Sequence, residues 1–142
     1  MRTYDPAAVD VTFNGILIQG FVTDEFITAT RDEDGWGFQP NVSGGGARSR
    51  NPVKSGTVTL TLTQAAPANA LLQAIATADE LSGSGVGELF IKDRSTAAGQ
   101  VSASNAWIQK QPDFNRAVEI GQVQWVIRCE VLNFFHDGVI DA

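Results

Sequence analysis

Two side chains near the C-terminus are of the types that form a catalytic pair. His136 is the only histidine and Cys129 the only cysteine of the chain. A thiol nucleophile beside a histidine base is a recurrent catalytic arrangement. Cys129, however, lies on the apolar side of an alternating segment, where cysteine behaves as a small hydrophobic residue. We therefore expect Cys129 in the core, no catalytic residues, and a protein that is not an enzyme.

Two polar segments have the residue types of ion-binding loops. Asp32-Glu33-Asp34-Gly35 begins like a calcium loop, but its glycine comes too early and no glutamate follows at the twelfth position. Gly44-Gly45-Gly46-Ala47-Arg48 lacks the Gly-Lys-Ser/Thr ending of a phosphate loop. We read the first as a solvated turn, with a weak cation site or an intersubunit salt bridge as alternatives, and the second as flexible. No cofactor and no metal are predicted.

The charge balance argues against nucleic-acid binding. Ten basic and sixteen acidic residues give a net charge of −6. Binding through phosphates needs clustered Lys and Arg, and the one basic cluster here is Arg48, Arg50 and Lys54. An acidic protein repels DNA or lets it slide past without specific binding.

The chain also carries no export or membrane signal that we recognise. Residues 1–6 lack the apolar core of a signal peptide. No apolar run approaches the roughly 20 residues that span a bilayer. A single cysteine allows no internal disulfide, which is compatible with synthesis in the cytoplasm. We expect no membrane anchor.

The hydrophobic pattern predicts one mostly β domain over residues 1–142. A helix is expected at about 67–79, because Pro67 suits a first helical position and an apolar stripe of Leu71, Leu72, Ile75 and Ala78 follows. Asn14-Gly15 is a strong hairpin signal. The expected fold is an antiparallel sandwich or barrel. The predicted strands cover residues 8–13, 16–22, 25–31, 57–63, 86–92, 105–111 and 122–134.

The stretch from 32 to 56 is predicted to be a long extended arm, partly hairpin. Structureless segments of this length are usually functional. Trp36 and Phe38 in this polar stretch either fold back onto the core or anchor an interface, and we favour the interface. The strand after the arm alternates strictly, with Val58, Leu60 and Leu62 on one face and threonines on the other.

Several segments in order resemble the tail tube proteins of contractile-tailed (myovirus-type) bacteriophages. They are Met1-Arg2-Thr3-Tyr4-Asp5-Pro6 with its hairpin, Arg31-Asp32-Glu33-Asp34, the arm to Lys54-Ser55-Gly56, Thr57-Val58-Thr59-Leu60-Thr61-Leu62, and Gln64-Ala65-Ala66-Pro67-Ala68-Asn69-Ala70-Leu71-Leu72. The resemblance covers nearly the whole chain, and the ordered combination carries it rather than any one motif.

The resemblance implies a virion structural protein that self-assembles into hexameric rings. The rings would stack into a hollow tube through which DNA passes without specific binding. A tail sheath protein would surround the tube, and tape measure, baseplate and terminator proteins would meet it inside and at its ends. We expect the arm to contact other subunits through Asp32, Asp34, Trp36, Phe38, Arg48, Arg50 and Lys54. The candidates for the lumen wall are Glu25, Thr57, Thr59 and Thr61.

Three other functions remain open from the sequence. An inner-tube subunit of a contractile injection or secretion system would share the fold and the stacking. A monomeric β-sandwich binding module would display its aromatic residues as a platform. An enzyme is the weakest alternative, since it would need His136, Cys129 or the acidic turn to act.

Overall fold

The computed structural model describes residues 9–21, 26–93 and 99–135. These residues form ten strands and one helix, with all strand pairs antiparallel. The predicted mostly β fold is therefore confirmed. Met1 to Pro6, Glu25 and His136, which entered the sequence argument, lie outside the described residues.

Eight of the strands belong to one sheet. Its order is β2-β1-β7-β8-β9-β6-β3. The strand β10 pairs with the first part of β8, at residues 100–103, whereas β9 pairs with the last part, at residues 106–110. The strands are β1 (Val9–Phe13), β2 (Ile16–Ile18), β3 (Ile27–Arg31), β6 (Gly56–Thr63), β7 (Gly87–Asp93), β8 (Gln100–Lys110), β9 (Gln122–Cys129) and β10 (Leu132–Phe135).

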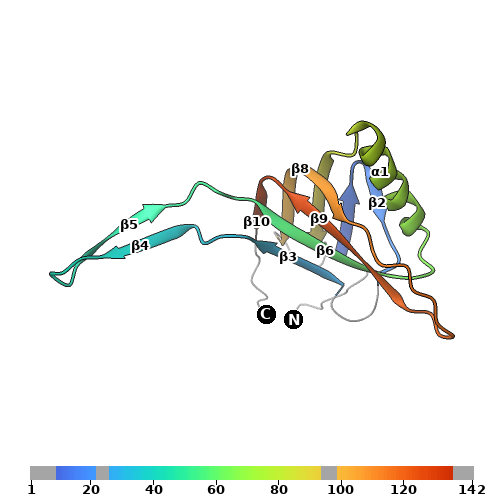
Figure 1. The fold of residues 1–142 in the computed structure, drawn as a ribbon, viewed down its shortest axis with the longest axis horizontal. Helices are drawn as coiled ribbons and strands as arrows, with labels where there is room; N and C mark the ends of the chain where they lie inside the picture. The colour runs from blue at the N-terminus through green and yellow to red at the C-terminus, as the bar shows by residue number, and fades with distance from the viewer. Residues whose placement is uncertain (1–8, 22–25, 94–98, 136–142) are drawn as a thin grey trace, which may run out of the picture.

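The sheet doubles back on itself to enclose the core. Figure 1 shows β3, β6 and β9 as one layer in front of β8, β7, β1 and β2. The segment after β2 returns to the first layer, because Phe21 forms a bridge with Leu62 and the Thr63 N–H donates to the Gly20 carbonyl at 2.8 Å. Side chains from both layers fill the interior, among them Val11, Phe13, Leu60, Leu89, Trp125 and Ile127. The sandwich-like architecture agrees with the sequence prediction.

Local sequence signals account for the first hairpin and for β6. Asn14 and Gly15 both have positive φ, 52° and 82°, as a type I′ turn requires. In β6, Val58, Leu60 and Leu62 are all 0% exposed. The alternating pattern therefore identified the buried face of this strand correctly.

The helix α1 (Ala68–Ser82) is longer than predicted, and only part of the predicted stripe is buried, since Leu72 and Ile75 pack on the core whereas Ala78 is exposed. No residue after Asp79 breaks the helix until Gly83, whose φ of 69° closes it and whose N–H donates to the Asp79 carbonyl. The buried residues are Ala68, Leu72 and Ala76. Leu71, assigned to the buried stripe from sequence, is instead 45% exposed. No helix in the described part of the chain has the length and apolar character needed to span a membrane.

The predicted last strand, 122–134, is two strands with a break at Glu130 and Val131. The Glu130 N–H donates to the Asn105 carbonyl at 2.9 Å, outside the regular ladder. The break shifts the alternation by one residue, so Leu132 rather than Val131 reaches the core, where it is 0% exposed. The strand β8 also starts earlier than predicted, at Gln100 rather than residue 105, because it pairs with both β9 and β10.

Candidate subunit-contact site

The arm is a two-stranded hairpin that stands apart from the main sheet. Its strands are β4 (Trp36–Pro40) and β5 (Gly46–Arg50), which pair only with each other among the described strands. Every residue of both strands is exposed. Figure 1 shows the hairpin reaching far from the body of the protein. The predicted extended arm is thus present, with a regular hairpin at its end.

Gly44 and Gly46 have structural roles in the turn at the tip of the hairpin. Gly44 has a φ of 91°, a conformation that favours glycine, and the Asn41 N–H donates to the Gly45 carbonyl at 2.9 Å. A Cβ on Gly46 would lie 2.6 Å from the ring of Phe38. It would also lie 2.8 Å from the Gln39 carbonyl oxygen, and this position favours glycine because that backbone atom cannot move aside as an exposed ring can.

The two faces of the hairpin differ in chemistry. Trp36 pairs with Arg50 and Phe38 with Arg48, so these four side chains share one face. We call these four residues the aromatic–arginine face. The Arg48 guanidinium carbon lies 3.9 Å from the centroid of the Trp36 ring, a cation–π distance. The opposite face carries only Gly37, Gln39, Ala47 and Ser49.

The aromatic side chains of this face do not fold back onto the core. Trp36 is 51% and Phe38 71% exposed. Aromatic residues and arginine are the types most enriched among residues that dominate binding energy at interfaces. Their exposure in the single subunit leaves them available to another molecule.

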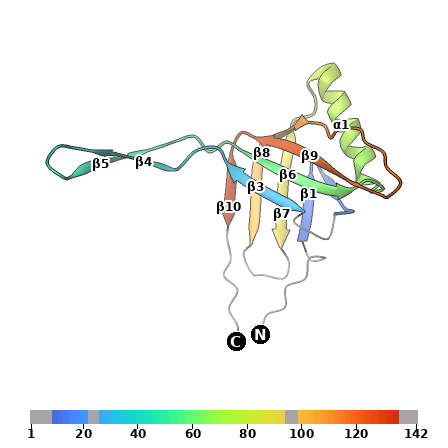
Figure 2. The ribbon, with the colours of Figure 1, turned by 60° about the horizontal axis from the view of Figure 1, so that its bottom comes forward.

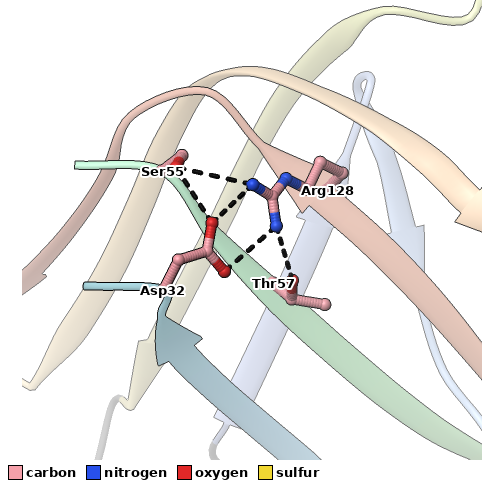
Figure 3. A network of polar contacts seen from close by, with 4 residues as sticks. All are labelled: Asp32, Ser55, Thr57 and Arg128. Atoms are coloured by element: carbon pink, nitrogen blue, oxygen red, sulfur yellow. Dashed lines mark hydrogen bonds and ion pairs between the residues drawn. The ribbon is translucent and has the colours of Figure 1, made fainter. Parts of the chain in front are cut away.

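A polar network fixes the base of the arm to the sheet (Figure 3). Asp32 and Arg128 form two contacts, Oδ2 to Nη2 at 2.5 Å and Oδ1 to Nη1 at 3.0 Å. The Ser55 hydroxyl donates to Asp32 at 2.9 Å, and Arg128 also reaches the Thr57 hydroxyl at 3.4 Å. Asp32 follows β3, Ser55 precedes β6 and Arg128 belongs to β9. The network thus joins both ends of the arm to a third strand.

The charge state of Asp32 is coupled to this network. The hydrogen bond from the Ser55 hydroxyl and the contacts with Arg128 hold the pKa of Asp32 below its usual value. The carboxylate is therefore ionised at neutral pH, when it accepts from both partners. The acidic turn acts here as an anchor within the subunit.

A second set of contacts braces the arm further along. The Asn51 side-chain amide donates to the Asp34 carbonyl at 3.0 Å, and the Asn51 backbone N–H donates to the Gly35 carbonyl at 2.9 Å. Lys54 accepts through its carbonyl from the Leu132 N–H at 2.8 Å. In the described residues, no three His, Cys, Asp or Glu side chains are grouped to hold a metal ion.

The seven arm residues named from the sequence thus fall into two groups. Trp36, Phe38, Arg48 and Arg50 come together on the hairpin, whereas Asp32, Asp34 and Lys54 lie at its base. Sequence reasoning missed Arg128 and Ser55 as anchors. Arg128 does stand on the polar side of its strand, but its partner Asp32 is 96 residues away in the chain.

The threonines proposed for the lumen wall do not all share one environment. Thr57 and Thr59 are half-buried on the outer face of β6, beside Thr30 and Thr28 of β3. Thr61 is only 6% exposed, so it does not belong to a wet surface. Its N–H donates to the Phe26 carbonyl at 2.9 Å, because the chain entering β3 runs directly beside it. Glu25 lies outside the described residues.

Cys129 is a core residue, as predicted. It is 0% exposed, and burial raises the pKa of its thiol to about 11. The thiol is therefore protonated at neutral pH and is a poor nucleophile.

The described residues form a two-layered β fold with a projecting hairpin that exposes aromatic and arginine side chains. Residues 9–135 match the family of the bacteriophage PhiTE tail tube protein. The chain belongs to this tail tube family, and it is thus a tail tube component of a phage or phage-like particle. No curated protein matches the sequence.

Solved structures of similar fold come from contractile particles. The cap of the anti-feeding prophage, its tube-terminating cap, has a TM-score of 0.63 at 14% identity over 94% of this chain and 91% of that one. The sheath/tube terminator of the extracellular contractile injection system PVC, in the extended state, gives 0.64 at 14% identity, covering 94% and 96%. The PVC sheath-tube complex in the extended state gives 0.64 at 12% identity, covering 92% and 90%. At these identities the similarity shows a shared fold.

Proposed function

We propose that this protein is the subunit of the inner tube of a contractile phage tail. Hexameric rings of the chain stack into a hollow tube, and DNA leaves through it. A sheath protein surrounds the tube, a tape measure protein lies within it, and baseplate and terminator proteins meet its ends. The protein is made in the host cytoplasm and functions in the virion. Its membership of a tail tube family and the fold it shares with tube components of contractile systems support this proposal.

The observation that carries the proposal is the arm with its aromatic–arginine face. An isolated two-stranded hairpin is marginally stable in water. This one nevertheless presents two aromatic rings and two arginines away from its own core. Contact with a second subunit would bury these side chains and order the hairpin. We assign the arm to contacts between subunits of the tube.

The outer face of the β3-β6-β9 layer fits a wall that DNA passes without sticking. Thr28 and Thr30 of β3 lie beside Thr59 and Thr57 of β6. The one arginine of β9 on this side, Arg128, is engaged by Asp32. Uncharged hydroxyl side chains on an acidic protein offer no phosphate-binding cluster. We propose this face, with Glu25 beyond the described residues, as the lumen wall, and we leave Thr61 out.

A second candidate is the inner tube of an injection system that delivers protein rather than DNA. The similar structures named as parts of an extracellular contractile injection system favour it. The fold is compatible with either machine. Detection of this chain in the tail tubes of purified phage particles would support the phage tube. Its detection in particles that lack DNA and a capsid would support the injection system.

Electron microscopy of the purified protein at rising concentration tests the proposal. Rings with six subunits, or hollow tubes built from them, are expected. A variant in which a short Gly-Ser linker replaces residues 36–50 should keep the folded body and form no tubes. Rings of another symmetry would contradict the hexamer, and normal tubes from the variant would contradict the role of the arm.

A further inference from the structure

A second group of exposed apolar side chains lies in the loop between β8 and β9. Phe114 is 82%, Val118 105% and Ile120 74% exposed. We call residues 113–120 the apolar loop. Figures 1 and 2 both show the segment before β9 at the end of the molecule opposite to the arm. Exposed apolar clusters of this kind mark interaction sites.

The subunit itself holds this loop in place. Gln64 donates through Nε2 to the Asn115 carbonyl and accepts through Oε1 from the Gly121 N–H, both at 3.1 Å. The Gln64 N–H also donates to the Gly121 carbonyl at 2.9 Å. A hollow of about 280 Å³ lies beside the loop, lined by Gln64, Ala65 and residues 116–120. The apolar side chains are therefore presented on a braced loop next to a space that can take a side chain.

The charges of the arm and of the loop region are complementary. Residues 35–54 contain three basic residues, Arg48, Arg50 and Lys54, and no acidic residue. The apolar loop contains two acidic residues, Asp113 and Glu119, and one basic residue, Arg116, whose guanidinium carbon lies 4.0 Å from the centroid of the Phe114 ring. A third carboxylate, that of Glu80 on α1, accepts a hydrogen bond from Gln111 just before the loop, at 2.9 Å. Three basic and no acidic residues give residues 35–54 a net charge of +3, and two acidic and one basic residue give the apolar loop a net charge of −1.

We propose that the apolar loop of one subunit receives the aromatic–arginine face of the arm of a second copy of this chain. The inference rests on the proposed self-assembly and adds the receiving surface. Trp36 and Phe38 would pack against Phe114, Val118 and Ile120. Arg48 and Arg50 would lie near the carboxylates of Asp113 and Glu119, which favours the correct partner and orientation.

The geometry of the contact agrees with an extended assembly. The arm and the apolar loop are different surfaces at opposite ends of the molecule, so their contact is heterologous. Repetition of a heterologous contact closes into a ring or continues as a helical filament, whereas a twofold dimer would pair identical surfaces. Each subunit would then insert its arm into one neighbour and bind the arm of another neighbour on its apolar loop.

Disulfide trapping between separately made chains tests the inference. Pro40→Cys places a thiol on the same face as Trp36 and Phe38, and Ala117→Cys places one beside the hollow. Both changes spare the proposed contact residues. The native Cys129 is fully buried and does not interfere. Oxidation of an equal mixture should give a disulfide-linked dimer that neither preparation forms alone.

The matched control is Ala78→Cys, which introduces a thiol at an exposed position of α1. A dimer of the Pro40→Cys and Ala117→Cys chains, without one between the Pro40→Cys and Ala78→Cys chains, supports the inference. Equal trapping at both positions, or no trapping at Ala117→Cys, overturns it. Microscopy of the unaltered protein separates the two proposals. If the unaltered protein forms tubes but the Pro40→Cys and Ala117→Cys chains form no disulfide with each other, the tube function stands and only the receiving surface is refuted.

Discussion

The strand β6 and the hairpin β4–β5 are neighbours in the chain, yet they are ordered by different means. The inward side chains of β6 are completely buried between two layers of the same subunit. Every residue of the hairpin strands is exposed, and the Arg48 guanidinium stacks on the Trp36 ring within the hairpin. The body therefore folds through its own hydrophobic core. The arm has chemistry for an interface and no core of its own. Mutations in the two regions should separate folding from assembly.

The largest effect is expected from Leu60→Asp in β6. The change places a carboxylate in the apolar core without a partner, which should destabilise the fold by more than about 4 kcal/mol. Thermal unfolding followed by circular dichroism would measure the loss. Thr59→Asp, one residue along on the outer face, is the control and should melt close to the native protein. Similar melting of the two variants would show that the faces of β6 are misassigned.

The second effect concerns the arm and should leave folding intact. Trp36→Ala and Phe38→Ala should each weaken subunit association by about 2 kcal/mol, roughly a thirtyfold loss of affinity, because such anchors dominate interfaces. Light scattering against concentration would measure it, with the melting temperature unchanged. Gln39→Ala and Ser49→Ala alter the opposite face and should assemble normally. Weakened assembly of this second pair alone would place the contact on the other face of the hairpin.

The third effect tests how arm and loop are paired. Arg48→Glu and Glu119→Lys should each lower association, by up to about fivefold if the charges are solvent-accessible. The double variant should recover part of the loss, because the two charges are exchanged rather than removed. Arg48→Glu combined with Glu88→Lys on β7 is the control and should show no recovery. Purely additive losses in the first pair would argue that these two side chains do not meet.

The smallest effect is expected at the base of the arm. The lowered pKa of Asp32 means that its contribution to stability is present above the pKa of an unpaired carboxyl group. That contribution is lost as the pH falls through the lower pKa of the folded state. Protection of the amides of residues 32–35 and 51–55 from hydrogen exchange, taken relative to the unprotected rate at the same pH, should therefore fall in that acidic range, with little change in the core. Asp32→Asn should show the faster exchange at neutral pH and less further response to acid. A native-like exchange rate in this variant would mean that the backbone alone holds the arm.

The described fold illustrates which features short-range sequence patterns predict well. The Asn14-Gly15 turn, the buried face of β6, the core position of Cys129 and the exposed arm all follow from nearest-neighbour chemistry or from a period of two. The helix was predicted, but its end was misplaced and its buried stripe was only partly identified. The apolar stripe alone did not say which turn of the helix would face the sheet, and Gly83 was a better marker of its end than the last apolar residue.

Other features depend on which segments meet in space. The break at Glu130 and Val131 arises because β8 pairs with β9 along one half and with β10 along the other. Thr61 carries the same polar side chain as Thr57 and Thr59, but it is buried, and its N–H donates to the carbonyl of Phe26, which directly precedes β3. No local pattern distinguishes these three threonines.

The sequence by itself determined a mostly β, acidic protein with a long arm that carries aromatic and basic residues, because charge, composition and alternation are properties of contiguous residues. Only the tertiary structure decided that Asp32 meets Arg128, that Trp36, Phe38 and both arginines share one face of a hairpin, and that the apolar loop lies at the opposite end from the arm. These relations depend on strand register and on the folding of the sheet onto itself. Both are set by the packing of the whole core, which joins residues far apart in the chain.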